Sequence, residues 1–235
     1  MIISLASHGK RLTESAYRAV CTLLDQTIEV PVYLYANTSP IPPKLRNLRG
    51  LVIREVDDLR SYSKLVWALR EFPNEAIATA DDDIYYPRDW LEKLVNYSRQ
   101  YPDRIISHRA HSIGIEDGKL MPYRKWLKCV NTAQFAFPTG GGGALYPPNS
   151  LYKDAADSDL FMKLCPTTDD VWFWAMAVLN DTRHGIVLNG HTKLNDIYNT
   201  EIPLSHDNVN GGINDKSLQA LINYYPKLKQ KLGLC

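Results

Sequence analysis

The stretch Ala76-Ile77-Ala78-Thr79-Ala80-Asp81-Asp82-Asp83 decides how this chain is interpreted, because an apolar, strand-like run ends there in three consecutive carboxylates. Carboxylates this close repel one another unless a cation lies among them or water screens them at a turn. Hard divalent cations such as Mg²⁺ and Mn²⁺ prefer oxygen ligands and keep places for water and substrate phosphates. The stretch therefore predicts a metal and diphosphate site at the carboxyl end of a strand, where open α/β sheets bind ligands. The alternative is a solvated acidic turn, or a cap for a helix that begins near Pro87.

Length and composition place the chain among ordinary globular proteins. Its 235 residues suit one large domain, and a hydrophobic share of 45% is enough for a good core. The net charge of +1 gives no electrostatic footprint for nucleic acid, and there is no run of eighteen apolar residues. The four cysteines are scattered without a C-x-x-C pair, and the first residues lack the pattern of a signal peptide. A cytoplasmic protein with reduced thiols is expected.

Strand-like and helix-like segments alternate in the first half. Apolar runs predict strands over 2–6, 32–36, 51–56, 76–80 and 104–108, and helical spacing predicts helices over 13–24, 63–71 and 87–100. The prolines at 40, 42 and 43 mark an extended connection. Such alternation predicts an α/β fold with a mostly parallel sheet and helices on both faces.

The pattern loosens after residue 108. Turn signals and a run of four glycines at 140–143 precede a predicted helix over 169–179, where the spacing of Val171, Trp174 and Val178 indicates burial. A strand over 185–188 and a last helix from about 215 to 232 follow. Residues 1–108 are expected to be the scaffold half of a single domain, and 109–235 its substrate half.

Several segments together resemble the nucleotide-sugar glycosyltransferases of the GT-A fold, in particular bacterial enzymes that build capsule and lipopolysaccharide sugars. The acidic segment, Asp81–Asp83, is similar to the D-x-D element of that family. The other similar segments are Ile2–His8, which resembles the first strand and nucleotide-binding turn, and two nucleotide-contacting stretches, Val56–Leu59 and Tyr62–Leu65.

The resemblance implies a GT-A-like, Rossmann-like single domain in which 1–108 binds the nucleotide sugar and 109–235 binds the acceptor and carries the catalytic residues. It implies metal-dependent transfer of a sugar, a hexose in the expected case, from a UDP-sugar to a hydroxyl of a glycan, with inversion, in bacterial surface polysaccharide synthesis. The acceptor would be a glycan or a lipid-linked glycan. Peripheral association with the inner face of the cytoplasmic membrane is compatible with such an acceptor.

The resemblance also assigns a metal site for Mn²⁺ or Mg²⁺. Asp83 matches the metal-binding residue, and Asp81 matches the residue that faces the ribose or the metal's water shell. Side chains alternate along a strand, so Asp81 and Asp83 are expected on the same side. His206 lies where many family members supply a third ligand, and His191 is a rival that spacing alone does not exclude.

Thr167-Thr168-Asp169-Asp170 resembles the acidic pair that opens a helix below the acceptor site in inverting members. Asp170 matches the residue that takes the proton from the attacking hydroxyl, and Asp169, where Glu is usual, is the second candidate. A competing interpretation is a capping box from Thr167 to Asp170. A helix N-terminus also lowers the pKa of a carboxyl group, which weakens a general base.

Further residues are expected to contact the donor. The glycine run offers close backbone approach and N–H groups to ligand oxygens, with a flexible turn as the alternative. Asp58 is expected to accept the N3–H of uracil, by resemblance, and His8 to stack on or bind the base. The full set of expected donor-binding residues is Ala6, Ser7, His8, Arg11, Asp58, Lys64, Asp81, Asp82, Gly141 and Gly142.

Two other function classes are alternatives to glycosyl transfer. A metal-dependent nucleotidyl- or phosphoryl-transfer enzyme also needs carboxylates at strand ends, but such enzymes usually have a glycine-rich loop after the first strand. The segment Ser7-His8-Gly9-Lys10-Arg11 has a single glycine. A non-catalytic carbohydrate-binding protein on the same fold is the third class, against which the presence of both Asp83 and Asp170 argues.

Overall fold

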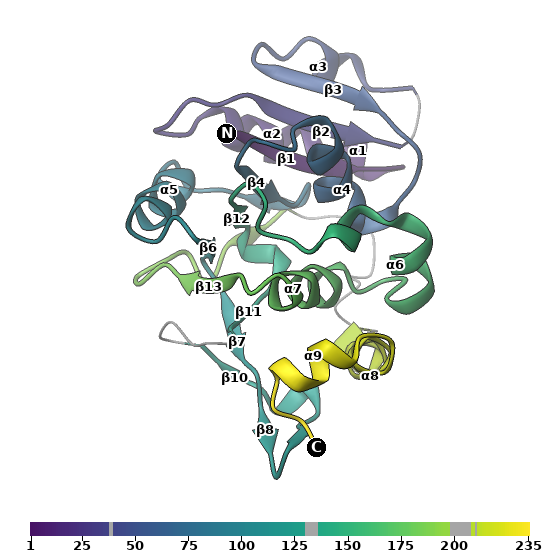
Figure 1. Ribbon diagram of the computed structural model, residues 1–235. Helices are drawn as coiled ribbons and strands as arrows, with labels where there is room; N and C mark the ends of the chain where they lie inside the picture. The colour runs from purple at the N-terminus through teal and green to yellow at the C-terminus, as the bar shows by residue number, and fades with distance from the viewer. Residues whose placement is uncertain (38–39, 130–135, 198–207, 210) are drawn as a thin grey trace.

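A seven-stranded sheet runs through the molecule, and helices pack on both of its faces (Figure 1). The computed structural model describes residues 1–37, 40–129, 136–197, 208–209 and 211–235. All neighbouring strands are parallel except for those beside β12, which is antiparallel to both of its neighbours. In spatial order the strands are β13 (Arg183–Ile186), β6 (Arg104–Ser107), β12 (Ala144–Tyr146), β4 (Ile77–Ala80), β1 (Ile2–Ser7), β2 (Val32–Ala36) and β3 (Leu51–Glu55). The expected α/β fold is confirmed.

Alternating side chains of the central strands build two separate cores. In β1, Ile2 joins the core that holds α4 (Ser63–Glu71) and α7 (Asp169–Leu179). Its neighbour Ile3 joins the core on the opposite face, with α2 (Ala16–Leu24) and α5 (Trp90–Gln100). Because both faces are covered, β1 and β4 are buried along nearly their whole length.

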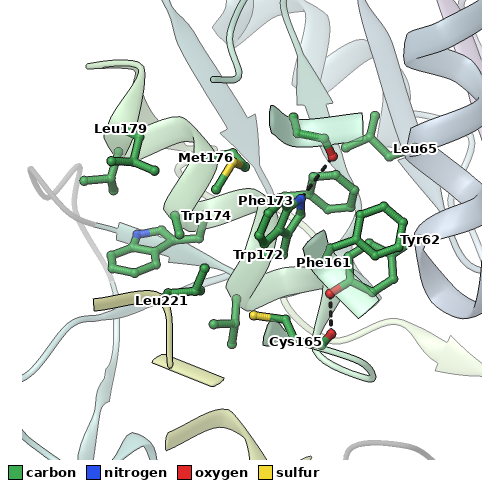
Figure 2. Packing of buried hydrophobic residues seen from close by; sticks show 14 of the residues in the cluster. Tyr62, Leu65, Phe161, Cys165, Trp172, Phe173, Trp174, Met176, Leu179 and Leu221 are labelled. Atoms are coloured by element: carbon green, nitrogen blue, oxygen red, sulfur yellow. Dashed lines mark hydrogen bonds between the residues drawn. The ribbon is translucent and has the colours of Figure 1, made fainter. Parts of the chain in front are cut away.

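The helix α7 is apolar on all sides, as expected for a helix surrounded by protein. Figure 2 shows Trp172 of this helix packed beside Tyr62 and Phe161, whose rings stack with centroids 3.9 Å apart. The indole N–H of Trp172 donates to the carbonyl of Ala155 over 3.0 Å. The burial of Val171, Trp174 and Val178 confirms the prediction from their spacing. This core fixes the first turn of α7, which carries Asp169 and Asp170.

The second half of the chain adds a smaller unit beside the sheet. A three-stranded sheet is formed by β10 (Leu127–Lys128), β7 (Ala110–Ser112) and β11 (Ala136–Pro138). The helices α8 (Ile213–Tyr224) and α9 (Pro226–Lys231) lie at this end of the molecule, far from β3 (Figure 1). The remaining elements are β5 (Ile84–Tyr85) paired with β14 (Asn195–Asp196), the hairpin of β8 (Ile115–Glu116) and β9 (Lys119–Leu120), and α6 (Ser158–Leu164).

Three predicted segments differ from the structure for local reasons. The helix expected over 13–24 is divided into α1 (Arg11–Glu14) and α2, because the Ser15 hydroxyl turns back to the Arg11 carbonyl and bends the chain. The last helix is divided at Tyr225, since Pro226 lacks an N–H and restricts the residue before it. The proline-rich connection contains a short helix, α3 (Pro43–Arg46), for which proline suits the first turn.

Candidate active site

The carboxyl ends of four parallel strands meet at one edge of the large sheet. His8 follows β1, Asn37 follows β2 and Asp81 follows β4, while Asp58 lies three residues beyond the end of β3. Most of the polar residues expected at the site are therefore brought to this edge, as in other open α/β sheets.

One arginine holds two residues of the acidic segment. Arg11, from the first turn of α1, places Nη1 2.9 Å from Oδ1 of Asp82 and 3.1 Å from Oδ2 of Asp83. Burial raises the pKa of Asp82, and Arg11 and the Ser7 hydroxyl oppose that rise. Burial, together with the neighbouring Asp81 and Asp82, raises the pKa of Asp83 to about 6. The carboxylates of the acidic segment therefore carry more negative charge than Arg11 alone neutralises.

A partly buried lysine joins the acidic segment to the start of α7. Nζ of Lys64 lies 2.9 Å from Oδ1 of Asp81 and 3.2 Å from Oδ2 of Asp169. Burial lowers the pKa of Lys64, but the surrounding carboxylates more than compensate and hold it well above its usual range. Burial likewise raises the pKa of Asp81, and Lys64 outweighs this so that the net shift is downward. Lys64 is therefore a cation at the junction of the two halves of the domain.

Asp170 lies beside this junction with a different environment. Its Oδ2 accepts a hydrogen bond from the backbone N–H of Gly140 over 3.0 Å. Burial, followed by the charge of Asp169, raises the pKa of Asp170 to about 7, although Lys64 and the Gly140 N–H act in the opposite direction. A carboxylate with a pKa near neutrality suits general-base catalysis. The helix N-terminus was expected to lower this pKa. The net shift is upward instead, because burial is the larger effect.

The capping box expected from Thr167 to Asp170 is not formed. Thr168 is the N-cap residue of α7, and its side chain does not bond the helix N–H groups. Its hydroxyl instead donates to Oγ of Ser217 over 2.8 Å, and the Thr167 hydroxyl donates to Oδ1 of Asn208 over 3.1 Å. The carboxylate of Asp170 thus has a role other than capping within this structure.

The glycine turn, Gly140–Gly142, passes directly over these groups. A Cβ at Gly140 would lie 3.0 Å from Oδ1 of Asp170 and 3.1 Å from Nζ of Lys64. The carbonyl of Gly142 accepts a hydrogen bond from the buried indole of Trp90 over 2.9 Å, which anchors the turn to α5. A small cavity of about 10 Å³, with room for about one water molecule, lies between Lys64, Tyr146, Asp170 and this turn.

The expected nucleobase contacts lie on the other side of the same edge. Oδ1 of Asp58 accepts hydrogen bonds from Nδ2 of Asn37 over 2.6 Å and from the backbone N–H of Arg60 over 2.7 Å. His8 is exposed, whereas Ser7 is buried and Ala6 is partly buried. Asp58 and His8 are thus accessible from solvent, whereas Ser7 is not.

The carboxylates at this edge fit a divalent cation in part. Among the described residues, no three His, Cys, Asp or Glu side chains converge to hold a metal ion. The crowded carboxylates of the acidic segment nevertheless fit a hard cation, which is commonly held by one or two carboxylates with water and substrate phosphates completing its shell. His191 is engaged elsewhere, with Nε2 2.6 Å from Oδ1 of Asp89. His206 lies outside the described residues.

Residues 18–161, more than half of the chain, match the family described as Glycosyl transferase family 2. The chain belongs to this family. It is accordingly a glycosyltransferase that uses nucleotide sugars, and the family match covers both the acidic segment and the glycine turn. No curated protein sequence matches this family 2 glycosyltransferase.

Solved structures with low sequence identity share the fold of this family 2 glycosyltransferase. The crystal structure of S. aureus TarS 1-349 has a TM-score of 0.56 at 12% identity, with 97% of this chain and 73% of that chain covered. TarS 1-349 in complex with UDP-GlcNAc has a TM-score of 0.58 at 13% identity, with 87% and 61% covered. CMP:2-keto-3-deoxy-manno-octonic acid synthetase complexed with CTP has a TM-score of 0.50 at 11% identity, with 79% and 88% covered.

The sequence analysis did not identify Arg109 as a residue of the site. Arg109 follows β6, and its Nε donates to Oγ1 of Thr139 over 2.5 Å, which places the guanidinium beside the glycine turn. A cation just after a strand end was the available signal.

Among the described residues, none of the helices combines the length and the hydropathy that a bilayer crossing requires.

Proposed function

We propose that this glycosyltransferase moves a sugar from a UDP-sugar to a hydroxyl of a glycan acceptor, with inversion at the anomeric carbon. The observation that carries the proposal is the position of Asp170. Its carboxylate, with a pKa of about 7, lies beside Lys64, which also pairs with Asp81 of the acidic segment. A proton acceptor and a diphosphate-binding edge thereby meet at one point of the sheet.

On the donor side, the exposed Asp58 and His8 are available to the uracil base and the acidic segment to the sugar diphosphate. Asp83 and Asp81 would hold a Mn²⁺ or Mg²⁺ ion, which when bound would neutralise the diphosphate as it leaves. The UDP-GlcNAc bound in the TarS structure supports a uridine nucleotide as the donor, since the fold is shared.

On the acceptor side, Asp170 takes the proton of the attacking hydroxyl as the oxygen bonds to the anomeric carbon and the bond to the diphosphate breaks. The Gly140 N–H holds Oδ2 of Asp170, and Asp170 lines the small cavity together with Lys64 and Tyr146. Asp169 is paired with Lys64, which makes it the weaker candidate for the base. Positioning of the two substrates supplies most of the rate.

A role in bacterial surface polysaccharide synthesis, of the capsule or lipopolysaccharide type, belongs to this proposal. It rests on the resemblance of the acidic segment to that group of enzymes. A lipid-linked glycan acceptor at the inner face of the cytoplasmic membrane is the corresponding partner.

The test is a screen of UDP-sugars for donor hydrolysis with and without Mn²⁺, accompanied by calorimetry with UDP. We expect one UDP-sugar to be hydrolysed and UDP to bind more tightly with the metal present. Preference for a nucleoside triphosphate over every UDP-sugar would favour nucleotidyl transfer instead. Binding of sugars without hydrolysis of any donor would favour a carbohydrate-binding protein.

A further inference from the structure

Arg109 differs from the other two basic side chains of the site. Arg11 is paired with Asp82 and Asp83, and Lys64 is paired with Asp81 and Asp169. Within the described ranges, Arg109 forms no ion pair, although its charge acts on the carboxylate of Asp81. A guanidinium in such an acidic site is expected to pair unless the structure holds it away from the carboxylates.

Two contacts hold Arg109 in this orientation. Its Nε donates to Oγ1 of Thr139 over 2.5 Å, and the Thr139 backbone N–H donates to the Arg109 carbonyl over 3.2 Å. Only the first of these bonds uses the guanidinium, and it takes one of its five N–H donors. In the part of the chain that the structure describes, the four N–H groups on Nη1 and Nη2 have no hydrogen-bond acceptor.

The glycine turn makes room for this side chain. A Cβ at Gly141 would lie 2.9 Å from Nη2 of Arg109, and a Cβ at Gly142 would lie 3.1 Å from its Cβ. A side chain at Gly141 would push the end of Arg109 aside, and one at Gly142 would require a smaller displacement of a few tenths of an ångström. The absence of side chains at both positions therefore allows Arg109 to lie against the turn.

The charge of Arg109 shifts the pKa of groups in two segments, β7 and the acidic segment. Burial is the larger influence on the pKa of His111, in β7, and Arg109 lowers it further. Arg109 also adds to the lowering of the pKa of Asp81 by Lys64. Arg109 itself lies in the chain between β6 of the large sheet and β7 of the small sheet, and its guanidinium lies beside the glycine turn.

We propose that Arg109 is an oxyanion-binding residue, whose two terminal nitrogens take two oxygens of a substrate phosphate or carboxylate. The planar fork of arginine matches such groups in a bidentate manner, and no carboxylate of the described protein occupies it. The oxyanion is either the donor diphosphate or an acidic group on the acceptor glycan, which share this chemistry. The inference rests on the proposed function for the meeting of the two substrates at this edge.

The test measures the binding of four probes by calorimetry at fixed ionic strength: UDP, uridine, inorganic pyrophosphate and D-glucuronate. Arg109→Gln removes the fork, and Arg109→Lys keeps the charge without the bidentate geometry. Gly141→Ala displaces the fork and leaves the arginine in place. Arg124→Gln is the matched control, since Arg124 is an exposed arginine of the same half.

We expect Arg109→Gln to weaken the binding of at least one oxyanion probe about tenfold or more, with Arg109→Lys and Gly141→Ala less affected. Uridine binding and the control variant should match wild type. Loss with UDP and pyrophosphate identifies the donor diphosphate, and loss with glucuronate alone identifies an acidic acceptor.

Equal affinity of wild type and Arg109→Gln for every oxyanion probe would overturn the inference, as would the absence of oxyanion binding by wild type. The proposed function fails separately. Should neither UDP nor uridine bind while pyrophosphate binding still depends on Arg109, the donor assignment is wrong and the oxyanion site stands. Hydrolysis of a UDP-sugar by wild type, together with equal binding of every oxyanion probe by wild type and Arg109→Gln, would leave the function and remove the site.

Discussion

The backbone N–H of Gly140 donates a hydrogen bond to Oδ2 of Asp170 over 3.0 Å, so the glycine turn fixes the carboxylate from above. A methyl group at Gly140 would approach both Oδ1 of Asp170 and Nζ of Lys64. We predict that Gly140→Ala lowers kcat about ten- to a hundredfold, because a displaced carboxylate no longer meets the acceptor hydroxyl. The measurement is steady-state transfer, with the thermal unfolding midpoint as a check that the protein is folded. An unchanged kcat would show that the turn does not position Asp170.

Asp170→Asn should lower transfer about 10²- to 10⁴-fold, since the amide cannot accept the proton of the acceptor hydroxyl. UDP binding should be unchanged, because Asp170 lies away from the nucleotide side. The comparison variant is Asp169→Asn, whose carboxylate is paired with Lys64. Full activity of Asp170→Asn together with an inactive Asp169→Asn would assign the base to Asp169.

The pH dependence of transfer follows from the same carboxyl group. Because burial raises the pKa of Asp170 to about 7, kcat/KM should rise with pH through about 7 as the proton is lost. Lys64 lowers this pKa, so Lys64→Met should move the rise to higher pH. An acidic limb near the ordinary carboxyl range, about pH 4, would contradict the assignment.

A linked effect on stability should accompany this titration. The pKa of Asp170 is higher in the folded protein than in the unfolded chain, so its stabilising contribution is complete below the unfolded value and is lost as pH rises through about 7. Denaturant unfolding should therefore show wild type losing stability relative to Asp170→Asn between about pH 4 and pH 8. A constant difference across this range would show that the group does not titrate in the folded state.

Asp83→Ala should abolish detectable turnover while the protein remains folded, because the diphosphate would lose its metal-binding carboxylate. Since the pKa of Asp83 is raised to about 6 by burial and by its neighbours, Mn²⁺-dependent UDP binding should weaken as the pH falls through about 6. Calorimetry on both sides of this pH checks the effect. Wild-type turnover of Asp83→Ala would remove this residue from the mechanism.

The sequence predicts the parallel strands and the acidic edge of the sheet well, because both depend on local information. Buried strands are continuous apolar runs, and a carboxylate that follows such a run must lie at the strand end. The positions of Asp81 and Asp58 at one edge follow from the parallel order of the strands.

The pairing of charges could not be predicted, because it depends on contacts between distant segments. Lys64 was expected among the donor-binding residues, and nothing in the sequence indicated that it pairs with both Asp81 and Asp169. The raised pKa of Asp170 comes from burial, which helical spacing at Thr167–Asp170 does not reveal. The three-residue strand β12 was missed because a segment this short, directly after four glycines, carries no periodic pattern.

The insertion of β12 between β4 and β6 has a consequence for the engineering of new specificities. A chimera that exchanged residues 109–235 for the acceptor half of another transferase would remove a central strand from the nucleotide-binding sheet. It would leave Thr79 and Ser107 without their register partner Ala144. Grafts that preserve the sheet must therefore leave Ala144–Tyr146 in place and replace only the segments that flank it.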